Sequence, residues 1–251
     1  MTIISKKMRK KSNLLKNSFF ILKERINETG DVITLKFFPI KGKIFSFIPG
    51  QFVDVYFLDD RCGGQGKPYS ISSISSDNFL NITVKKIGKF SGALHDLKIG
   101  EKVKISSPQG YFYPEDEMKD IIFLAGGIGI TPFYSIISAY FKQEINDRNF
   151  TLFYSNKTEK DVVFLKELNK LIKIWKRFKI INIFTREKKK NYFDKNKEFQ
   201  RLNVKILKKY LKNLNNKHYF ICGSIGFVND LWKELTNNKV KEENIRVESF
   251  Y

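Results

Sequence analysis

The stretch IIFLAGGIGITP, residues 121–132, decides the fold that the sequence predicts. Its five apolar residues, 121–125, are typical of a strand that is buried on both faces of a parallel sheet. Helical periodicity begins at Pro132, and proline is favoured in the first turn of a helix. A strand, a glycine turn and a helix start together predict an anion cradle, because free backbone N–H groups there point at the ligand. The cradle residues are Gly126, Gly127, Gly129 and Thr131. The alternative is a turn that merely joins two core elements.

Around this stretch the sequence changes character near Pro114. Downstream, apolar runs alternate with helical stretches, which predicts an α/β domain with a parallel sheet and helices on both faces. Upstream, short strands separated by glycine turns predict an all-β antiparallel barrel that begins with a hairpin, turning at residues 27–31. The predicted division is a basic leader at residues 1–17, the barrel domain at residues 18–114 and the α/β domain at residues 115–251. The Lys/Asn-rich segment 187–198 is interpreted as a mobile loop.

The composition restricts the partners and the setting. A net charge of +20, from 46 Lys and Arg against 26 Asp and Glu, favours acidic partners. The excess is mostly lysine and accompanies abundant asparagine and isoleucine, which is also typical of biased nucleotide composition, so no nucleic-acid partner is expected. No apolar run is long enough to cross a bilayer, and we expect a cytoplasmic protein with no transmembrane segment. Two cysteines, Cys62 and Cys222, exclude a disulfide framework, and neither His95 nor His218 has metal-ligand spacing, so no metal is expected.

The segment KPYS, residues 67–70, follows a glycine loop and begins a predicted strand. Lys67 and Tyr69 alternate along the strand and therefore face one side. A planar ring would stack on Tyr69 while Lys67 neutralises a phosphate, and Ser70 would donate a hydrogen bond to a ring nitrogen. The alternative is an ordinary half-buried strand.

Two further segments carry possible ligand chemistry. The turn 88–92 combines glycines, a serine hydroxyl and a helix start, and it predicts a second anion cradle. Two cradles in one chain suggest ligands that contain pyrophosphates. Cys222 follows another buried apolar run, at the carboxyl end of a predicted parallel strand, where ligands bind in open α/β sheets. It is interpreted as a small polarisable contact at the edge of a substrate ring, with a buried structural cysteine as the alternative.

The order of motifs along the chain resembles the ferredoxin–NADP⁺ reductase superfamily. The motifs are PGQF, KPYS, GKxSxxL, PxGxF, AGGxGITP, CGS and the terminal VESFY. The chain is similar to the compact bacterial ferredoxin or flavodoxin reductases from residue 19 onward. The resemblance implies an FAD-binding barrel followed by an NAD(P)-binding α/β domain. The chain contains no CxxxxCxxC cluster, so a fused plant-type iron–sulfur centre is not expected.

The resemblance also implies roles for individual residues. Lys67 replaces the usual arginine beside the flavin phosphates, Tyr69 stacks on the isoalloxazine, and Ser70 approaches its N5. The residues implied to hold the FAD pyrophosphate are Gly88, Ser91 and Gly92, and those implied to hold the nicotinamide nucleotide are Gly126, Gly127, Gly129 and Thr131. Those implied at the hydride-transfer centre are Cys222 near the nicotinamide C4, Glu248 as the assisting acid, and Phe250 or Tyr251 covering the flavin face.

The choice of nucleotide stays open at this point. Thr185-Arg186 and, downstream, Arg201 resemble the positions where NADPH-specific relatives bind the 2′-phosphate, and two guanidinium groups suit that anion. The segment SNKTEKD, residues 155–161, is instead similar to NADH-using cytochrome b5 reductases. NADPH is the expectation and NADH the alternative.

The function implied by the resemblance is hydride transfer between NAD(P)H and FAD, followed by delivery of electrons to an acidic carrier such as a ferredoxin or flavodoxin. A free-flavin reductase and the reductase component of an oxygenase are alternatives. An alternative of another class is a basic, non-catalytic binding module on the same fold.

Overall fold

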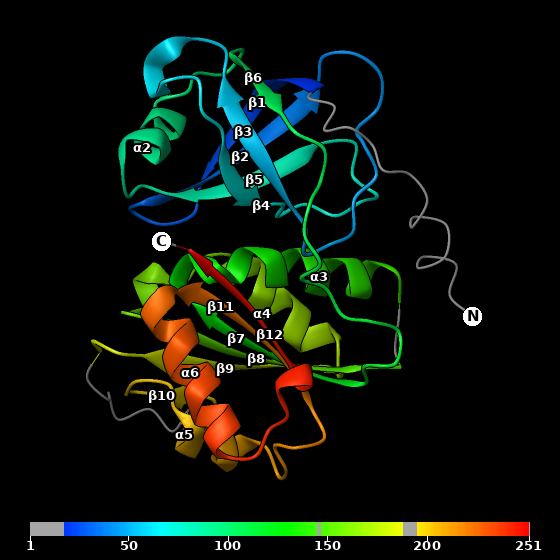
Figure 1. Ribbon diagram of the computed structural model, residues 1–251, viewed down its shortest axis with the longest axis vertical. Helices are drawn as coiled ribbons and strands as arrows, with labels where there is room; N and C mark the ends of the chain where they lie inside the picture. Colours follow the sequence, from blue (N-terminus) through cyan, green and yellow to red (C-terminus); the bar gives the residue numbers. More distant parts are fainter. Residues whose placement is uncertain (1–17, 145–146, 188–194, 251) are drawn as a thin grey trace.

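The computed structural model describes residues 18–144, 147–187 and 195–250. The basic leader, Tyr251 and the middle of the Lys/Asn-rich segment lie outside the described residues. Figure 1 shows an antiparallel sheet structure stacked above a parallel sheet that is covered by helices. The two predicted halves are therefore present, in the predicted order.

The first half is a six-stranded antiparallel sheet that closes on itself. The strands are β1 (Ser18–Asn27), β2 (Val32–Pro39), β3 (Phe52–Phe57), β4 (Lys67–Ser70), β5 (Leu80–Lys85) and β6 (Lys102–Ile105), with the short helices η1 (Asp60–Cys62) and α2 (Lys89–His95). Their spatial order is β4-β3-β6-β1-β2-β5. An isolated bridge between Ile71 and Ile82 joins the two ends of this order, so the sheet forms a barrel. The predicted hairpin is confirmed by the antiparallel pairing of β1 with β2.

Alternating apolar residues build the interior of the barrel. Val53 and Val55 on β3 and Ile82 and Val84 on β5 are completely buried, since successive side chains of a strand point to opposite faces. His95, at the end of α2, shares a hydrogen bond of 3.0 Å between its Nε2 and the carbonyl oxygen of Val84. The predicted structural role of His95 is consistent with this contact.

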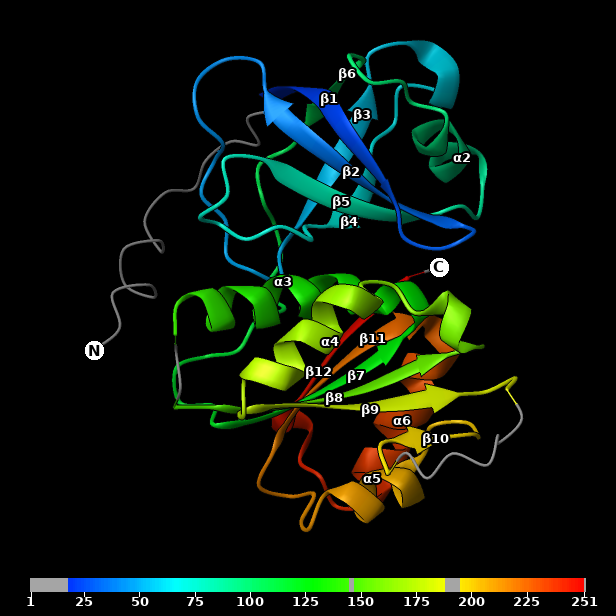
Figure 2. The same cartoon turned by 180° about the vertical axis from the view of Figure 1, so that it is seen from behind.

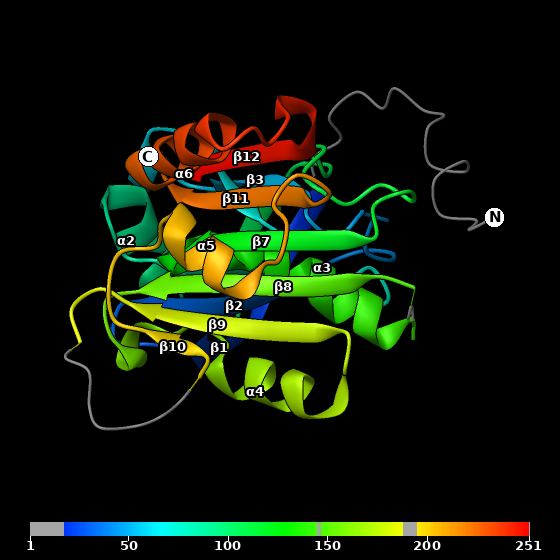
Figure 3. The ribbon, with the colours of Figure 1, turned by 90° about the horizontal axis from the view of Figure 1, so that it is seen from below.

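The second half is a parallel sheet of six strands. The strands are β7 (Asp120–Gly126), β8 (Asn149–Asn156), β9 (Phe178–Phe184), β10 (Lys197–Glu198), β11 (His218–Ser224) and β12 (Ile245–Phe250). The helices are α3 (Ile130–Lys142), α4 (Leu165–Ile174), α5 (Val204–Tyr210) and α6 (Ile225–Asn237), with the short turns η2 (Gly127–Gly129), η3 (Glu159–Asp161) and η4 (Glu242–Asn244). Figure 3 shows the strands side by side in the order β10-β9-β8-β7-β11-β12.

Helices cover both faces of the parallel sheet, as predicted. Figure 2 shows α3 and α4 between the sheet and the barrel, while α5 and α6 lie on the far side. One hydrophobic cluster lies on the α3 and α4 face, and a separate one lies on the α5 and α6 face. The strands are buried on both faces, which explains why they read as unbroken apolar runs.

The structure corrects two details of the predicted elements. Lys197 and Glu198, assigned to a loop, form β10 and pair in parallel with Asn182 and Ile183. A charged two-residue strand has neither apolar alternation nor β propensity, so the pattern gave no signal for it. The sequence pattern predicts a helical stretch VVFLKELNKLIKIW from Val162, but helix α4 begins at Leu165, because Phe164 adopts a left-handed backbone with φ of +59°.

Two arginines of the α/β domain hold the connection between the two halves. Arg246 on β12 donates from Nη1 to the carbonyl oxygen of Tyr113 at 2.8 Å and from Nη2 to Oε1 of Glu115 at 2.6 Å. Arg148, which is 5% exposed, donates from Nη1 to the carbonyl oxygen of Glu115 at 2.8 Å. We call residues 113–116 the linker. It is fixed to the α/β domain by charge-assisted hydrogen bonds, which are the stronger kind.

Candidate active site at the junction of the two domains

The sheet order places a crevice at the carboxyl ends of β7 and β11. The chain runs from β7 outward to β8, β9 and β10, and then returns to place β11 on the other side of β7. Ligands of open α/β sheets bind at such a reversal of strand order. The glycine turn after β7 and residues 222–224 at the end of β11 therefore lie at the same edge of the sheet.

The glycine turn needs its glycines for close approach. A Cβ added to Gly129 would lie 2.2 Å from the carbonyl oxygen of Cys222, which no side chain tolerates. Gly127 has a φ of +53°, in the left-handed region that favours glycine. Thr131 is buried and donates from Oγ1 to the carbonyl oxygen of Ile128 at 3.1 Å, so its hydroxyl stabilises the turn itself.

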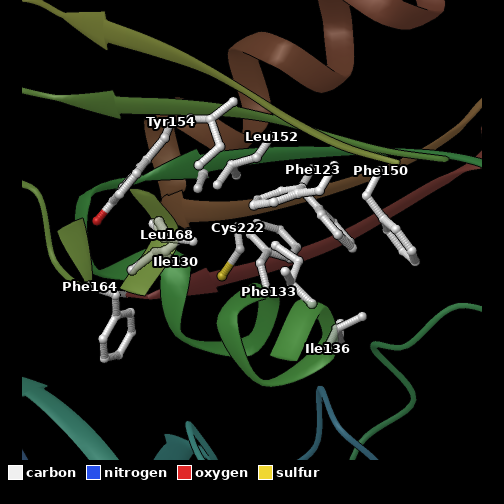
Figure 4. Packing of buried hydrophobic residues seen from close by; sticks show 14 of the residues in the cluster. Phe123, Ile130, Phe133, Ile136, Phe150, Leu152, Tyr154, Phe164, Leu168 and Cys222 are labelled. Carbon is white, nitrogen blue, oxygen red and sulfur yellow. The ribbon is translucent and has the colours of Figure 1, made fainter. Parts of the chain in front are cut away.

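Cys222 lies in the core beneath this turn. It is completely buried, and Figure 4 shows its side chain among Ile130, Phe133 and other apolar residues of the cluster. Burial, with a smaller contribution from the charge of Glu248, raises the pKa of the Cys222 thiol well above its usual value. The thiol therefore stays protonated at neutral pH, which disfavours a nucleophilic role. Its contact with a nicotinamide ring stays a prediction.

Glu248 is the carboxylic acid of the crevice. It pairs in register with Cys222 across β11 and β12. Burial raises the pKa of its carboxyl group to about 7, because a low-dielectric environment disfavours the charged form. Its Oε1 atom lies 3.9 Å from the position that a Cβ on Gly110 would take. Glu248 can therefore bind or release a proton near neutral pH at the junction with the barrel.

Ser70 approaches the same corner from the barrel. It ends β4 and pairs with Phe52 of β3, and Phe52 also forms a bridge with Gln109. The ring of Phe52 lies 3.1 Å from the Cβ position of Gly110, the glycine next to Glu248. Phe52 and Gly110 therefore connect Ser70 with Glu248 across the two domains.

The hydroxyl group of Ser70 has no internal partner. The residue is 5% exposed, and its buried Oγ atom makes no hydrogen bond within the described part of the chain. An unsatisfied buried polar group costs about 1–3 kcal/mol. Folded proteins rarely retain such a group without a reason, and a bound ligand that supplies a hydrogen-bond partner is one such reason.

The other residues of the KPYS segment lie around the barrel mouth. Tyr69 is half-buried and its ring stacks on that of Phe90, with centroids 6.2 Å apart and planes inclined at 28°. Lys67 begins β4 and is exposed. Tyr69 therefore presents part of an aromatic surface next to the turn 88–92, and the stacking on isoalloxazine stays a prediction.

The second cradle differs from the first in its hydrogen bonds. The Ser91 hydroxyl accepts from the N–H groups of Ile87 and Gly88, at 2.9 Å each, and donates to the carbonyl oxygen of Gly88 at 3.0 Å. Gly92 donates its N–H to the same carbonyl at 2.8 Å. The side chain of Ser91 is thus used to close the turn, and its role toward a pyrophosphate stays a prediction.

A cavity of about 200 Å³ lies beside the first cradle, between the two domains. Val32 and Lys85 line it from the barrel, and Gly127, Asn156, Asp161 and Thr185 are among its residues from the α/β domain. Asn156 is 5% exposed, and its side-chain amide interacts with the Tyr154 hydroxyl, while its Oδ1 atom has no hydrogen-bond partner within the described residues. The cavity therefore contains a second buried polar group that is only partly satisfied.

Sequence reasoning included Asn156 only within a segment that resembles NADH-using reductases. Its signal was a polar side chain at the end of a buried strand, immediately after FTLFYS. Sequence reasoning missed Gly110 and Phe52 as the connection between Ser70 and Glu248, because no local pattern reports a contact between domains.

The two predicted phosphate-binding arginines lie at the same edge of the sheet. Arg186 comes two residues after the end of β9, and Arg201 comes three residues after β10, which pairs with β9 in parallel. Both are exposed. Arg201 forms an ion pair with Asp230 of α6, with Nη2 and Oδ2 2.6 Å apart. The structure thus brings their backbones to neighbouring strand ends, and their ligand stays a prediction.

The remaining predictions concern the last strand and the absence of metal. Phe250 ends β12, pairs with Ser224 and contacts the cluster on the α3 face. Within the described ranges, no group of three His, Cys, Asp or Glu side chains could hold a metal ion. No helix of the described ranges is long and apolar enough to cross a membrane.

Comparison with known families assigns the two halves. The family model for the oxidoreductase FAD-binding domain matches residues 20–113, and the model for the oxidoreductase NAD-binding domain matches residues 123–233. The chain therefore consists of an oxidoreductase FAD-binding domain followed by an oxidoreductase NAD-binding domain, an arrangement that fits the ferredoxin–NADP⁺ reductase superfamily. It is an FAD- and NAD(P)-binding oxidoreductase.

Relatives within the superfamily differ in their partners. The chain is 29% identical over 247 residues to flavohemoprotein A of Dictyostelium discoideum, covering 92% of this chain and 59% of that protein. It is 33% identical over 171 residues to NADH-cytochrome b5 reductase 2 of Mycosarcoma maydis, covering 64% and 49%. It is 36% identical over 152 residues to the glycine betaine monooxygenase reductase subunit of Pseudomonas aeruginosa, covering 57% and 40%. The chain thus spans about three fifths of the flavohemoproteins that it matches.

Solved structures show the same fold. The FAD/NAD-binding domain of a nitric oxide dioxygenase from Vibrio cholerae aligns with a TM-score of 0.82 and 22% identity, covering 93% of this chain and 98% of that one. A ferredoxin NADP⁺ reductase from Neisseria gonorrhoeae, solved with FAD and NADP, aligns with a TM-score of 0.79 and 20% identity, covering 94% and 99%. At these identities the likeness concerns the fold.

The residues present fit the two cofactors of the superfamily. The unsatisfied Ser70 hydroxyl offers a hydrogen bond at the mouth of the FAD-binding barrel, and the Oδ1 atom of Asn156 offers an acceptor beside the first cradle. A Cβ on Gly127 would meet nothing within 4 Å, so the turn is open at this glycine and leaves space for a pyrophosphate. Ser70 would therefore face the flavin, and the first cradle with Asn156 would face the nicotinamide nucleotide.

Proposed function

We propose that this chain takes a hydride from NAD(P)H onto FAD and passes electrons to a ferredoxin- or flavodoxin-like carrier. The observation that carries the proposal is the convergence of Ser70 and Glu248 at one corner, from different domains, around Phe52 and Gly110. One group is an unsatisfied hydroxyl and the other is a half-buried acid with a raised pKa. FAD, when bound, supplies the chemistry that converts a two-electron donor into single electrons.

The residues of the chain would bind, orient and exchange a proton. Ser70 donates its hydroxyl hydrogen to the cofactor, which satisfies the buried oxygen. Glu248 holds or releases a proton at its carboxyl group, because its pKa of about 7 allows both states at neutral pH. Cys222 keeps the crevice apolar and excludes water around the transferred hydrogen, since its thiol stays protonated.

NADPH is the proposed donor. Arg186 and Arg201 begin the loops that leave two adjacent parallel strand ends, where a 2′-phosphate would meet two guanidinium groups. The similarity to NADH-cytochrome b5 reductase 2 favours NADH as the second candidate. Only NADPH carries the 2′-phosphate, so replacing the arginines should weaken the use of NADPH and not that of NADH.

The carrier is proposed to be an acidic protein, because the chain has a net charge of +20. A second candidate function is the reductase component of an oxygenase, which the similarity to a monooxygenase reductase subunit favours. A free-flavin reductase is a further alternative. A non-catalytic binding module would have no use for a half-buried acid with a pKa near 7. A reducing compartment such as the cytoplasm is the proposed setting, since Cys62 and Cys222 are free thiols.

Anaerobic mixing of the purified protein with NADPH or NADH tests the proposal. The flavin should be released as FAD on denaturation, and its visible absorbance should bleach after mixing. Reoxidation should then follow on adding a ferredoxin or flavodoxin, and the rates with these carriers, free flavins and oxygenase components rank the acceptors. FMN as the sole bound flavin, or no bleaching with either nucleotide, would show that the proposed reaction is wrong.

A further inference from the structure

The turn of the first hairpin extends from the barrel into the α/β domain. Figures 1 and 2 show the turn between β1 and β2 directed toward the lower domain. Val32, the first residue of β2, is buried in the hydrophobic cluster of the α/β domain rather than in that of the barrel. The N–H groups of Glu28 and Thr29 donate to the carbonyl oxygen of Val32 at 3.0 and 3.2 Å, so the turn is closed.

Glu28 joins the two domains through its carboxylate. It accepts a hydrogen bond of 2.6 Å from the Thr34 hydroxyl of the barrel to Oε1. The backbone N–H of Phe164, the residue that precedes α4, faces the same carboxylate and acts to lower its pKa. The pKa of Glu28 is raised, chiefly by burial and also by the charge of Glu167 on α4, while the Thr34 hydroxyl and the Phe164 N–H act to lower it. These two donors stabilise the ionised form of the half-buried carboxyl group.

The Phe164 turn requires such support. A non-glycine residue with φ of +59° is strained by roughly 1–3 kcal/mol. The Phe164 ring stacks on Tyr134 of α3, with centroids 3.9 Å apart and planes inclined at 16°. The backbone N–H of Phe164 is the part of the turn that faces Glu28, and this contact comes from the other domain.

A buried chain of hydroxyl groups supports the carboxylate from behind. Thr34 Oγ1 lies 2.8 Å from Thr83 Oγ1, which lies 2.8 Å from Ser72 Oγ, and all three residues are at most 4% exposed. An ionised carboxylate only accepts, so Thr34 donates to it, Thr83 donates to Thr34, and Ser72 donates to Thr83. Hydrogen bonds aligned in one direction strengthen each other.

The segment that Glu28 fixes is also a wall of the cavity. Asp161 and Val163 line the cavity immediately before Phe164, and Val32 lines it immediately after the hairpin turn. A shift of the Phe164 turn would therefore move the wall on one side relative to the wall on the other. The cavity is the one that contains the partly satisfied Asn156 amide.

We propose that Glu28 is a positioning residue that holds the 161–164 segment against the barrel and thereby sets the affinity for the nicotinamide nucleotide. This proposal rests on the proposed function in one respect, namely that the cavity binds the nicotinamide nucleotide. Glu28 does not touch the reacting groups at Ser70 and Glu248. Its loss should therefore weaken nucleotide binding and leave the rate of the saturated enzyme almost unchanged.

The test uses the flavin-containing protein and four variants, three of which are described first. Glu28→Gln removes the charge at nearly constant shape. Thr34→Val removes one donor and leaves the charge. The control is Glu24→Gln on β1, where an exposed carboxylate pairs with Lys36. Glu28→Gln should raise the KM for the nucleotide roughly tenfold, in line with the loss of a charge-assisted contact. Thr34→Val should raise it by less, and Glu24→Gln should leave it unchanged.

Two measurements do not depend on turnover. The dissociation constant of the oxidised nucleotide, measured by calorimetry, should rise by the same factor as the KM. The Leu168 amide, which donates to the Phe164 carbonyl at 2.9 Å in the first turn of α4, should exchange with solvent faster in Glu28→Gln. If the wild-type protein binds nucleotide without oxidising it, the proposed reaction fails while these measurements still test Glu28.

An unchanged dissociation constant in Glu28→Gln would overturn the inference. A fall in kcat as large as the rise in KM would also overturn it, because a positioning role predicts that KM rises while kcat stays almost unchanged. If Glu28→Gln does not fold, Thr34→Val decides, and unchanged nucleotide affinity in that variant would likewise overturn it. Glu28→Asp keeps the charge one methylene shorter and should recover part of the affinity.

Discussion

The two glycine turns of this molecule look alike in sequence and differ in their surroundings. The turn 88–92 lies on the barrel surface, and the Ser91 hydroxyl satisfies its N–H groups from within. The turn after β7 is pressed against the end of β11, and unsatisfied polar groups lie nearby at Ser70 and Asn156. A glycine-rich turn before a helix is therefore ambiguous by itself. The crowding of the backbone and the unpartnered groups around it distinguish the site that needs a ligand.

The largest expected difference between the two turns concerns an added methyl group. Gly129→Ala places a Cβ 2.2 Å from the Cys222 carbonyl oxygen and should lower the free energy of unfolding by about 3 kcal/mol or more. Gly92→Ala meets only the Lys86 side chain at 3.9 Å and should be neutral or stabilise α2 by up to about 1 kcal/mol. Urea unfolding of both variants measures the contrast, and similar effects would mean that the crowding at Gly129 relaxes without cost.

The second prediction concerns the acid at the crowded crevice. The pKa of Glu248 is about 7 when folded and near its usual value of 4.5 when unfolded. Between these values the folded state binds more protons, so the stability that protonation contributes is complete below the lower value and is lost as pH rises through the upper one. The loss is about 1.4 kcal/mol per pH unit, or about 3 kcal/mol in all.

Glu248→Gln should remove this dependence. The difference in unfolding free energy between the wild type and the variant, measured at about pH 5 and about pH 8, isolates the contribution of Glu248 from the other titrating groups. Glu243→Gln, an exposed residue paired with Lys241, is the control and should change little. A difference that does not vary with pH would contradict the raised pKa.

The third prediction concerns the edge of the sheet beyond the crevice. Arg186→Ala should raise the KM for NADPH between about tenfold and a hundredfold, by the loss of a charge-assisted hydrogen bond, with little change for NADH. Arg201→Ala should have a smaller effect, since Arg201 also pairs with Asp230. Arg177→Ala is the control, because Arg177 binds Asn149 at the opposite end of β9. Equal loss with both nucleotides would mean that these arginines do not bind the 2′-phosphate.

The smallest expected effects concern the two serine hydroxyls, and they have opposite signs. Ser91→Ala removes the group that closes the turn 88–92 and should destabilise the flavin-free protein by about 1–2 kcal/mol. Ser70→Ala removes an unsatisfied buried hydroxyl and should leave the flavin-free protein unchanged or stabilise it by up to about 1 kcal/mol. Thermal unfolding of the flavin-free variants measures both. Destabilisation by Ser70→Ala would mean that its hydroxyl already has a partner.

The sequence predicted the parts of the fold that depend on local pattern. Apolar runs such as IIFLA identify buried parallel strands, and alternation identifies the hairpin of β1 and β2. It could not predict β10, whose residues are Lys197 and Glu198, since that strand exists through pairing with β9 alone. The start of α4 was misplaced because the strain at Phe164 is held by groups from elsewhere in the chain.

The candidate site shows the same limit. Motif order was sufficient to select Ser70, Cys222 and Glu248 and the glycines of the first cradle. It did not report that the Ser91 hydroxyl is satisfied within its own turn. It also did not report that the Oδ1 atom of buried Asn156 lacks a hydrogen-bond partner in the described part of the chain. Both facts depend on which donors and acceptors lie close together in the folded chain, and residue spacing does not contain this information.

The arginine contacts of the linker bear on how chimeric reductases should be assembled. Arg148 and Arg246 both bind residues 113–116, so this segment is part of the α/β half although it directly follows the barrel in sequence. A crossover placed after residue 116 would separate these arginines from their native acceptors and leave Arg148 buried without them. A crossover before Gln109 would instead divide Phe52 from its bridge partner. The crossover with another reductase is therefore best placed after Gln109 and before residue 113. The linker then comes from the same parent protein as the parallel sheet.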